Sequence, residues 1–221
     1  MQTIKAVIFD LDGTIANTIP LCIQSFRKAI EPLINRPLSD AEIIATFGPS
    51  EEGTIQALAP EHFDQGISEY FRIYEALHDM CPTPFEGIVE LLTALQNKQV
   101  RIAMVTGKGK YCTDLTLQKF GISHFFEIIE TGQPSGPNKV EGIQNVVDYF
   151  ENIAKNEMVY IGDTPGDIDA SKQVGISVLA AAWADTAESQ KLKELKPDGL
   201  FYRIEDMKEW LIKRFRKNIE L

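Results

Sequence analysis

The sequence predicts an α/β protein with a doubly wound parallel sheet, similar to a Rossmann fold, that carries an inserted all-helical segment. From residue 85 onward, short apolar runs alternate with helical segments, which is typical of parallel strands joined by helices. The first run, residues 6–9, is apolar on both faces, as in a strand at the centre of a sheet. We therefore expect an α/β core formed by residues 1–15 and 83–221 and a helical insert formed by residues 16–82.

Local signals place the individual elements. Pro20 suits the first turn of a helix, Ser39 and Glu42 form a capping box, and residues 61–77 carry apolar side chains at helical spacing. The helices expected in the insert are residues 18–30, 40–47, 51–58 and 61–77. The strands expected in the core are residues 6–9, 100–105, 125–130, 158–161, 176–182 and 199–202. The helices expected between and after them are residues 85–96, 110–120, 139–150, 167–174 and 204–215.

Composition narrows the function classes. The 221 residues have a formal net charge of −10, which argues against a nucleic-acid partner. No segment is long and apolar enough to span a membrane, and the N-terminal residues lack the pattern of a signal peptide, so we expect a cytoplasmic protein without a membrane partner. The three cysteines are widely spaced and form no Cys-x-x-Cys pair, so we expect reduced thiols.

Two aspartates at the end of the first strand are the strongest functional signal. Asp10 and Asp12 leave the strand together, and Gly13 then permits a tight turn. Ligands of open α/β sheets bind at the carboxyl ends of the strands. Asp10 is suited to attack an electrophile. Two carboxylates this close repel each other, which favours the protonated form of one of them, so Asp12 is suited to transfer protons.

This stretch has two other interpretations. The pattern Asp-x-Asp-x also opens an EF-hand, but Gly13 stands at the fourth position instead of the sixth, and Leu21 occupies the place of the closing glutamate. A calcium loop is therefore excluded. A surface turn rich in Asp and Gly remains an alternative for this stretch taken alone.

Polar residues also follow two later strands. Thr106, Gly107 and Lys108 stand at a strand-to-helix turn, where a hydroxyl and backbone N–H groups can hold phosphate oxygens. Asp163 and Asp167 stand after another strand, and carboxylates are natural ligands of Mg²⁺. Helix caps and turns are the alternative for each of these motifs. Lys139 lies at a helix start, where a positive charge does not favour the helix, so we expect a functional role for it.

Together these motifs resemble those of the haloacid dehalogenase-like (HAD) superfamily, in its phosphoglycolate phosphatase-like and β-phosphoglucomutase-like branch with a helical cap. The resemblance implies that Asp10 is the nucleophile that forms an aspartyl-phosphate and that Asp12 is the general acid and base. It implies that Thr106 binds phosphate and that Lys139 steadies the nucleophile, with Lys108 as the alternative lysine. The implied Mg²⁺ ligands are Asp10, the Asp12 backbone carbonyl and Asp163, with Asp167 beside them.

The resemblance also implies the reaction. Dehalogenases of the family lack an acid at the place of Asp12, because halide needs no proton, so a phosphate ester is the expected substrate. We expect a Mg²⁺-dependent phosphatase that hydrolyses a small phosphorylated metabolite, as a monomer or homodimer. The expected substrate-binding residues are Gly13, Thr14, Gly107 and Lys108. A phosphomutase of the β-phosphoglucomutase type, or a non-catalytic module that binds a phosphate ligand, is the alternative.

The helical insert is expected to close over the site and to contact the leaving group. Residues 29–97 contain no lysine, which argues against the Schiff-base chemistry of the family's phosphonatases. Residues 47–53 resemble the family's specificity loop in placement and carry acids in place of a base. We therefore expect a leaving group that is neutral or cationic.

Overall fold

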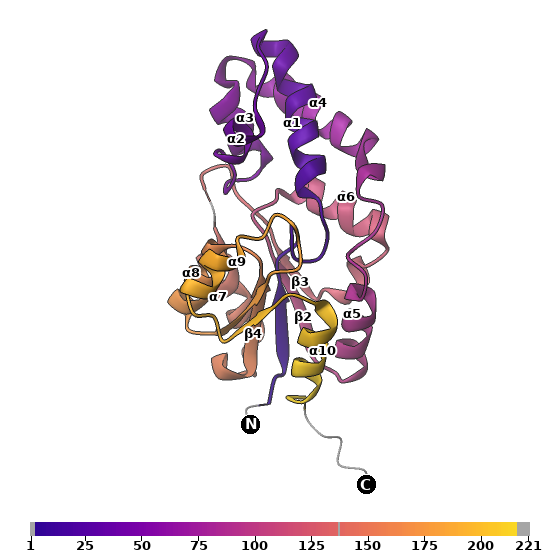
Figure 1. The fold of residues 1–221 in the computed structure, drawn as a ribbon, viewed down its shortest axis with the longest axis vertical. Coiled ribbons are helices and arrows are strands. Elements are labelled where there is room, and N and C mark those ends of the chain that lie inside the picture. Colours follow the sequence, from indigo (N-terminus) through magenta and orange to yellow (C-terminus); the bar gives the residue numbers. More distant parts are fainter. Residues whose placement is uncertain (1–2, 137, 216–221) are drawn as a thin grey trace.

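The computed structural model describes residues 3–136 and 138–215. Within these residues, six parallel strands form one sheet in the order β3-β2-β1-β4-β5-β6 (Figure 1). The strands are β1 (Ala6–Phe9), β2 (Arg101–Val105), β3 (Ile128–Glu130), β4 (Met158–Gly162), β5 (Ser177–Ala181) and β6 (Gly199–Phe201). This order is doubly wound, with the change of direction between β1 and β4, and it confirms the fold class that the sequence predicts.

The central strand β1 is buried on both faces. It pairs with β2 on one side and with β4 on the other, and Phe9 lies level with Met104 and Ile161. Its side chains alternate: Val7 and Phe9 join one hydrophobic cluster, whereas Ala6 and Ile8 join the cluster on the opposite face. This double burial explains why the strand is apolar throughout.

Two layers of helices cover the sheet. One face packs against α5 (Ile88–Asn97), α6 (Lys110–Phe120) and α10 (Ile204–Ile212). The other packs against α7 (Lys139–Tyr149), α8 (Pro165–Val174) and α9 (Ser189–Glu194). Figure 1 shows α5 and α10 on one side of the sheet and α7, α8 and α9 on the other. Among the described residues, no helix has the length and apolar character needed to cross a bilayer.

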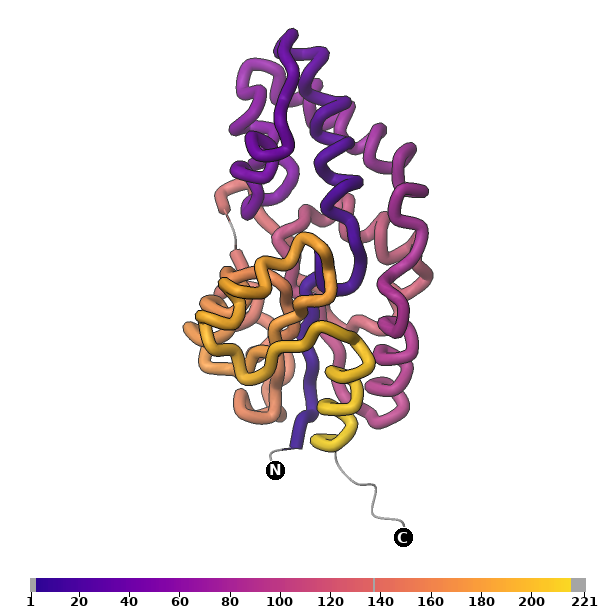
Figure 2. The backbone as a smooth tube through the Cα atoms, viewed as in Figure 1, coloured from indigo at the N-terminus to yellow at the C-terminus, as the bar shows by residue number. Residues whose placement is uncertain are grey.

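The helical insert lies at the end of the sheet where the strands terminate. It contains α1 (Ile19–Ile34), α2 (Asp40–Ile44), α3 (Glu51–Leu58) and α4 (Phe63–Ala76), together with short 3₁₀ turns. Figure 2 shows the chain entering it directly from β1 and returning toward α5 along one side of the molecule. The rings of Phe26 of α1 and Tyr70 of α4 contact each other in a tilted arrangement, with centroids 4.2 Å apart, so aromatic packing joins the helices of the insert.

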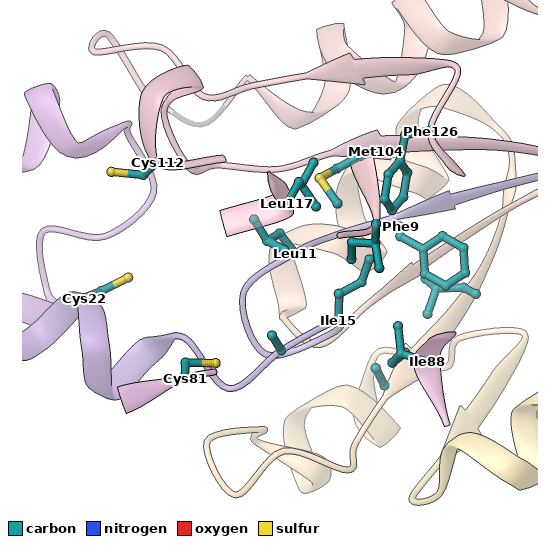
Figure 3. Close-up of a cluster of buried hydrophobic side chains, with 14 of the residues drawn as sticks. Phe9, Leu11, Ile15, Cys22, Cys81, Ile88, Met104, Cys112, Leu117 and Phe126 are labelled. Carbon is teal, nitrogen blue, oxygen red and sulfur yellow. The ribbon is translucent and has the colours of Figure 1, made fainter. Parts of the chain in front are cut away.

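One hydrophobic cluster joins the insert to the sheet. Figure 3 shows Phe9, Leu11, Ile15 and Met104 packed at its centre, with the side chain of Cys22 farther toward the insert. The three cysteines are free and buried, as the sequence predicts. The insert is therefore continuous with the core that holds the sheet together.

The loop before α3 lies directly on loops of the core. The amide of Ser50 donates to the carbonyl of Gln133 over 3.0 Å. A Cβ on Gly107 would lie 3.1 Å from the carbonyl oxygen of Gly48, and a Cβ on Gly53 would lie 2.5 Å from the carbonyl oxygen of Pro134. Small residues on both sides thus permit close backbone contact between the insert and the strand ends.

Several elements differ from the sequence-based expectation. The expected helix 61–77 is a 3₁₀ turn (Pro60–His62) followed by α4, and the expected strand 125–130 is a 3₁₀ turn (Ser123–Phe125) followed by β3. Helix α5 begins three residues later than expected, after Gly87, whose φ of 93° is left-handed. Helix α8 begins at Pro165 because Thr164 caps it. The short polar helix α9 was not expected.

Replacing Gly132 by alanine should destabilise the protein. A Cβ there would lie 1.8 Å from the carbonyl oxygen of Gly107, so the loops after β2 and β3 would have to separate. We expect a loss of about 3 kcal/mol in the free energy of unfolding, measured by urea denaturation. At Gly166 the nearest atom to an added Cβ is 3.6 Å away, so Gly166→Ala is the control and should change stability by less than about 1 kcal/mol. Equal stability of the two variants would contradict this packing.

Candidate active site

The ends of three neighbouring strands bring the predicted site residues together. Because Phe9 lies level with Met104 and Ile161, Asp10 emerges beside the residues that precede Thr106 and Asp163. A cavity of about 370 Å³ lies over this edge of the sheet. Its core wall is formed by Asp10, Asp12, Thr106, Gly107, Lys108, Lys139, Asp163, Thr164 and Gly166. Sequence positions up to 156 residues apart, from Asp10 to Gly166, therefore form one concave site.

Asp10 is held at both carboxylate oxygens. Its Oδ1 accepts from the amide of Leu11 over 2.8 Å, and its Oδ2 lies 2.7 Å from Nζ of Lys139. Burial raises the pKa of Asp10 to about 6, although the positive charge of Lys139 opposes the shift. The side chain is thus fixed in orientation at the tip of β1.

Asp163 and Asp167 complete a buried acidic cluster with Asp10. One ligand atom of each lies within 4.8 Å of the others. Burial, followed by repulsion from Asp10, raises the pKa of Asp163 well above its ordinary value. Burial opposes ionisation of Asp167 as well, but Lys139 and Thr164 outweigh it and lower the pKa of that carboxyl.

Asp167 has hydrogen-bond partners on both oxygens. Its Oδ1 accepts from Lys139 and from the hydroxyl of Tyr160, 2.9 Å away. Its Oδ2 accepts from the amide and hydroxyl of Thr164, at 2.9 and 2.6 Å. This carboxylate therefore caps α8 and fixes Lys139. It accepts more hydrogen bonds than Asp10 or Asp163 does, so those two keep more lone pairs for a ligand.

Asp12 faces a second lysine. Its Oδ1 accepts from the hydroxyl of Thr18 and lies 3.2 Å from Nζ of Lys108. Burial opposes the charge of Lys108, but Asp12 and the other groups around it, Glu51 among them, together outweigh burial, so the pKa of Lys108 is raised well above its ordinary value. The two lysines that the sequence offers as alternatives thus have different partners, Lys139 at Asp10 and Lys108 at Asp12.

Thr106 is oriented by the turn that follows β2. Its Oγ1 accepts from the amide of Lys108 over 3.2 Å, and its own amide donates to the carbonyl of Glu130 over 3.0 Å. The hydroxyl hydrogen is therefore available to a ligand in the cavity.

Gly13 and Thr14 do not line this cavity. The hydroxyl of Thr14 donates to Oδ1 of Asp163 over 2.9 Å, and a Cβ on Gly13 would lie 2.1 Å from Oδ2 of the same carboxylate. Gly13 also has a φ of 78°, which favours glycine. Both residues therefore support Asp163, a different position from the substrate contact expected from the sequence.

The cluster fits a divalent cation. Three buried carboxylates share a single ammonium group, that of Lys139, which pairs with Asp10 and Asp167. The pKa values of Asp10 and Asp163 are raised, first by burial and then by neighbouring carboxylates, so a positive charge between them would be favourable. Oxygen ligands of this kind suit Mg²⁺. The carboxylate of Asp12 is not part of the cluster among the described residues, and a contribution from its backbone carbonyl stays a prediction.

Sequence reasoning missed several residues that hold the site. Thr18, Tyr160 and Thr164 fix Asp12 and Asp167. The spacing of Thr164 and Asp167 is that of an acidic capping box and was a usable signal. In the sequence Glu51 is recognisable only as an acid of the insert. No local sequence pattern indicates that it lies 3.5 Å from Lys108.

Three comparisons bear on the identity of the chain. A sequence model of the haloacid dehalogenase-like hydrolases matches residues 7–181. Pyrophosphatase PpaX of Bacillus pumilus is 28% identical over 215 residues, covering 93% of this chain and 95% of that protein. The structure of a haloacid dehalogenase-like hydrolase from Streptococcus pneumoniae matches with a TM-score of 0.72 at 24% identity, covering 94% and 98% of the two chains. That of a predicted phosphoglycolate phosphatase from Haemophilus somnus has a TM-score of 0.75 at 20% identity, covering 95% and 99%.

The fold and site define a doubly wound α/β protein whose polar residues gather where the strand order reverses. The chain belongs to the haloacid dehalogenase-like hydrolase family, as the resemblance of its motifs implies.

Mg²⁺ should stabilise the protein, and more strongly at higher pH. The pKa of Asp10 is raised from 3.8 to about 6, so the metal-free protein should lose stability as pH rises through that window. Mg²⁺ competes with protons for the same oxygens, so its effect should be small at about pH 5 and reach about 5–10 °C in Tm at about pH 7.5, with Mg²⁺ about 100-fold above Kd.

A pair of variants distinguishes Mg²⁺ binding at the carboxylate cluster from a general effect of ionic strength on stability. Asp163→Asn should abolish the shift in Tm, whereas Asp169→Asn, which changes an exposed residue of α8, the helix that carries Asp167, should retain it. A shift that is equal in both variants, or larger at low pH, would contradict a metal site at this cluster.

Proposed function

We propose that the chain is a Mg²⁺-dependent phosphatase that hydrolyses a small phosphomonoester through an aspartyl-phosphate on Asp10. The observation that carries this proposal is the position of Asp10. It lies at the end of β1, fixed by Leu11 and Lys139, in a cavity that also contains Asp12 and Thr106. A nucleophile, a proton carrier and a phosphate-binding hydroxyl therefore share one site.

In the first step, a carboxylate oxygen of Asp10 attacks phosphorus and the bond from phosphorus to the ester oxygen breaks. Lys139, 2.7 Å from Asp10, aligns the nucleophile, and the hydroxyl of Thr106 is available to bind a phosphoryl oxygen. Asp10 and Asp163 would hold Mg²⁺ together with the Asp12 backbone carbonyl. The bound ion would offset the negative charge of nucleophile and phosphate, so that the two can approach.

Asp12 moves the protons. Thr18 and Lys108 both contact Oδ1, so we assign proton transfer to Oδ2. In the first step protonated Asp12 gives its proton to the departing ester oxygen. In the second step the Asp12 carboxylate takes a proton from water, the water oxygen attacks phosphorus, and the bond between phosphorus and Asp10 breaks to release phosphate.

The helical insert acts as a cap in this proposal. Its loop 47–53 lies on the core loops and forms one side of the cavity, so the substrate reacts away from bulk water. The name pyrophosphatase, carried by relatives such as the Bacillus pumilus protein, is consistent with phosphoryl transfer to water. A cytoplasmic location and a monomeric or homodimeric state stay predictions.

Phosphate release from a panel of phosphomonoesters, with and without Mg²⁺, tests the proposal. Asp10→Asn should lower the rate by at least about 1,000-fold because the nucleophile is lost. The control Asp169→Asn should stay within about twofold of the native rate, since surface positions away from the site have little effect. Mg²⁺-independent release, or full activity of Asp10→Asn, would contradict the mechanism. No release, with an aspartyl-phosphate that persists, would favour a phosphomutase.

Asp12→Asn should separate the two steps. With p-nitrophenyl phosphate, whose leaving group needs no proton, the first step should survive while attack by water slows by about 10²–10⁴-fold. Rapid-mixing kinetics should then show a burst of about one p-nitrophenolate per active site, followed by slow turnover. Steady turnover at the native rate without a burst would contradict the role of Asp12.

A further inference from the structure

The cavity has two unlike walls. The wall formed by the core carries the charged groups described above. The wall formed by the insert consists mainly of Ile19, Cys22, Phe26, Phe47, Pro49 and Tyr70, with Glu51 and Thr54 beside them. Among the described lining residues, the insert contributes no lysine, arginine or histidine. A leaving group that carries a negative charge would therefore be buried against this wall without a cation from it.

Lys108 is the cation nearest to this wall, and its ammonium group already contacts side chains of the protein. Its ammonium lies 3.2 Å from Oδ1 of Asp12, 3.5 Å from Oε1 of Glu51 and 3.2 Å from Sγ of Cys22. Lys108 and Glu51 are each only 5% exposed, so water does not screen this pair. The positive charge is thus balanced within the protein before any substrate binds.

Glu51 reaches Lys108 because the insert is docked on the core. Its Oε2 accepts from the amide of Gly109 over 2.6 Å, which leaves Oε1 toward Lys108. A Cβ at Gly109 would lie 2.4 Å from Oε2, so only glycine permits this approach. Oε1 has no hydrogen-bond partner among the described residues, and its contact with Lys108 is an ion pair. The negative charge of Glu51 is therefore placed beside Lys108 by the docking of the insert.

Tyr70 places a hydroxyl group in the otherwise largely apolar wall of the insert. It is fully buried, it lines the cavity, and its hydroxyl has no hydrogen-bond partner among the described residues. Burial raises the pKa of Tyr70 well above its ordinary value, so the phenol stays neutral and can donate. A buried hydroxyl without a partner is energetically costly, and a ligand in the cavity that Tyr70 lines would supply the missing hydrogen bond. The nearby hydroxyl of Thr54 is already used, because it donates to the carbonyl of Thr46 over 3.1 Å.

We propose that this site takes phosphate esters of neutral, partly apolar alcohols that carry a hydroxyl or carbonyl within reach of Tyr70. Glu51 is the specificity residue that disfavours anionic leaving groups, because it neutralises Lys108. This inference rests on the proposed phosphatase function. The proposed substrate class differs from that of the relatives named pyrophosphatase, because the leaving group in pyrophosphate hydrolysis is phosphate, an anion.

The test compares kcat/KM for two neutral esters, phenyl phosphate and a diol monophosphate, with kcat/KM for pyrophosphate and phosphoglycolate. We expect the native enzyme to favour the neutral esters by at least about tenfold. Glu51→Gln keeps an acceptor for Gly109 and removes the charge, so it should raise the anionic-to-neutral ratio by about tenfold. Glu52→Gln is the matched control, because that carboxylate bonds the hydroxyl of Ser50, and it should leave the ratio unchanged.

The outcomes separate this inference from the proposed function. If no phosphoester is hydrolysed, the phosphatase function itself fails. If esters are hydrolysed but the native enzyme prefers anionic substrates, the specificity inference is overturned and the phosphatase function stands. If Glu51→Gln lowers kcat/KM equally for every substrate, Glu51 has only a structural role and its assignment is overturned.

Tyr70→Phe tests the hydrogen bond independently and keeps the aromatic packing. It should lower kcat/KM by at least about tenfold for the diol monophosphate and change it little for phenyl phosphate, which has no second hydroxyl. Equal losses on both esters would overturn the proposed contact.

Discussion

The repulsion between buried carboxylates at the ends of β1 and β4 is the constraint on which the rest of the site depends. Asp10, Asp163 and Asp167 lie together where water is scarce, so each negative charge raises the cost of the next. Lys139 pairs with both Asp10 and Asp167, so one positive charge faces three carboxylates. The excess negative charge is what a bound cation would offset in the proposed mechanism.

The sheet makes this crowding possible. Because β1 pairs with β2 and β4 in level register, the residues after these strands are held close by backbone hydrogen bonds. Both faces of β1 are buried, so the strand cannot shift to relieve the repulsion. A rigid apolar scaffold thus holds charged groups in an arrangement that they would not adopt alone.

The sheet and most of the site residues could be predicted from the sequence, for a physical reason. Strand ends of a parallel sheet converge, so local patterns that ended at Asp10, Thr106 and Asp163 also predicted their proximity. Contacts between distant segments were not accessible in this way. Lys108 and Glu51 lie 57 positions apart on different units, and no periodicity links them. The polar helix α9 buries only Leu192, so it leaves no apolar pattern to recognise.

The hydroxyl of Thr18 does not cap the first helix of the insert, although Thr18 stands at its N-terminal cap position. It donates to Asp12 instead. Asp12 is therefore attached to both parts of the molecule, through its backbone to the sheet and through its side chain to the start of α1. A rotation of the insert must either break this hydrogen bond or carry the carboxylate with it. In the proposed mechanism, opening of the cavity is therefore coupled to the orientation of the carboxylate that transfers the proton.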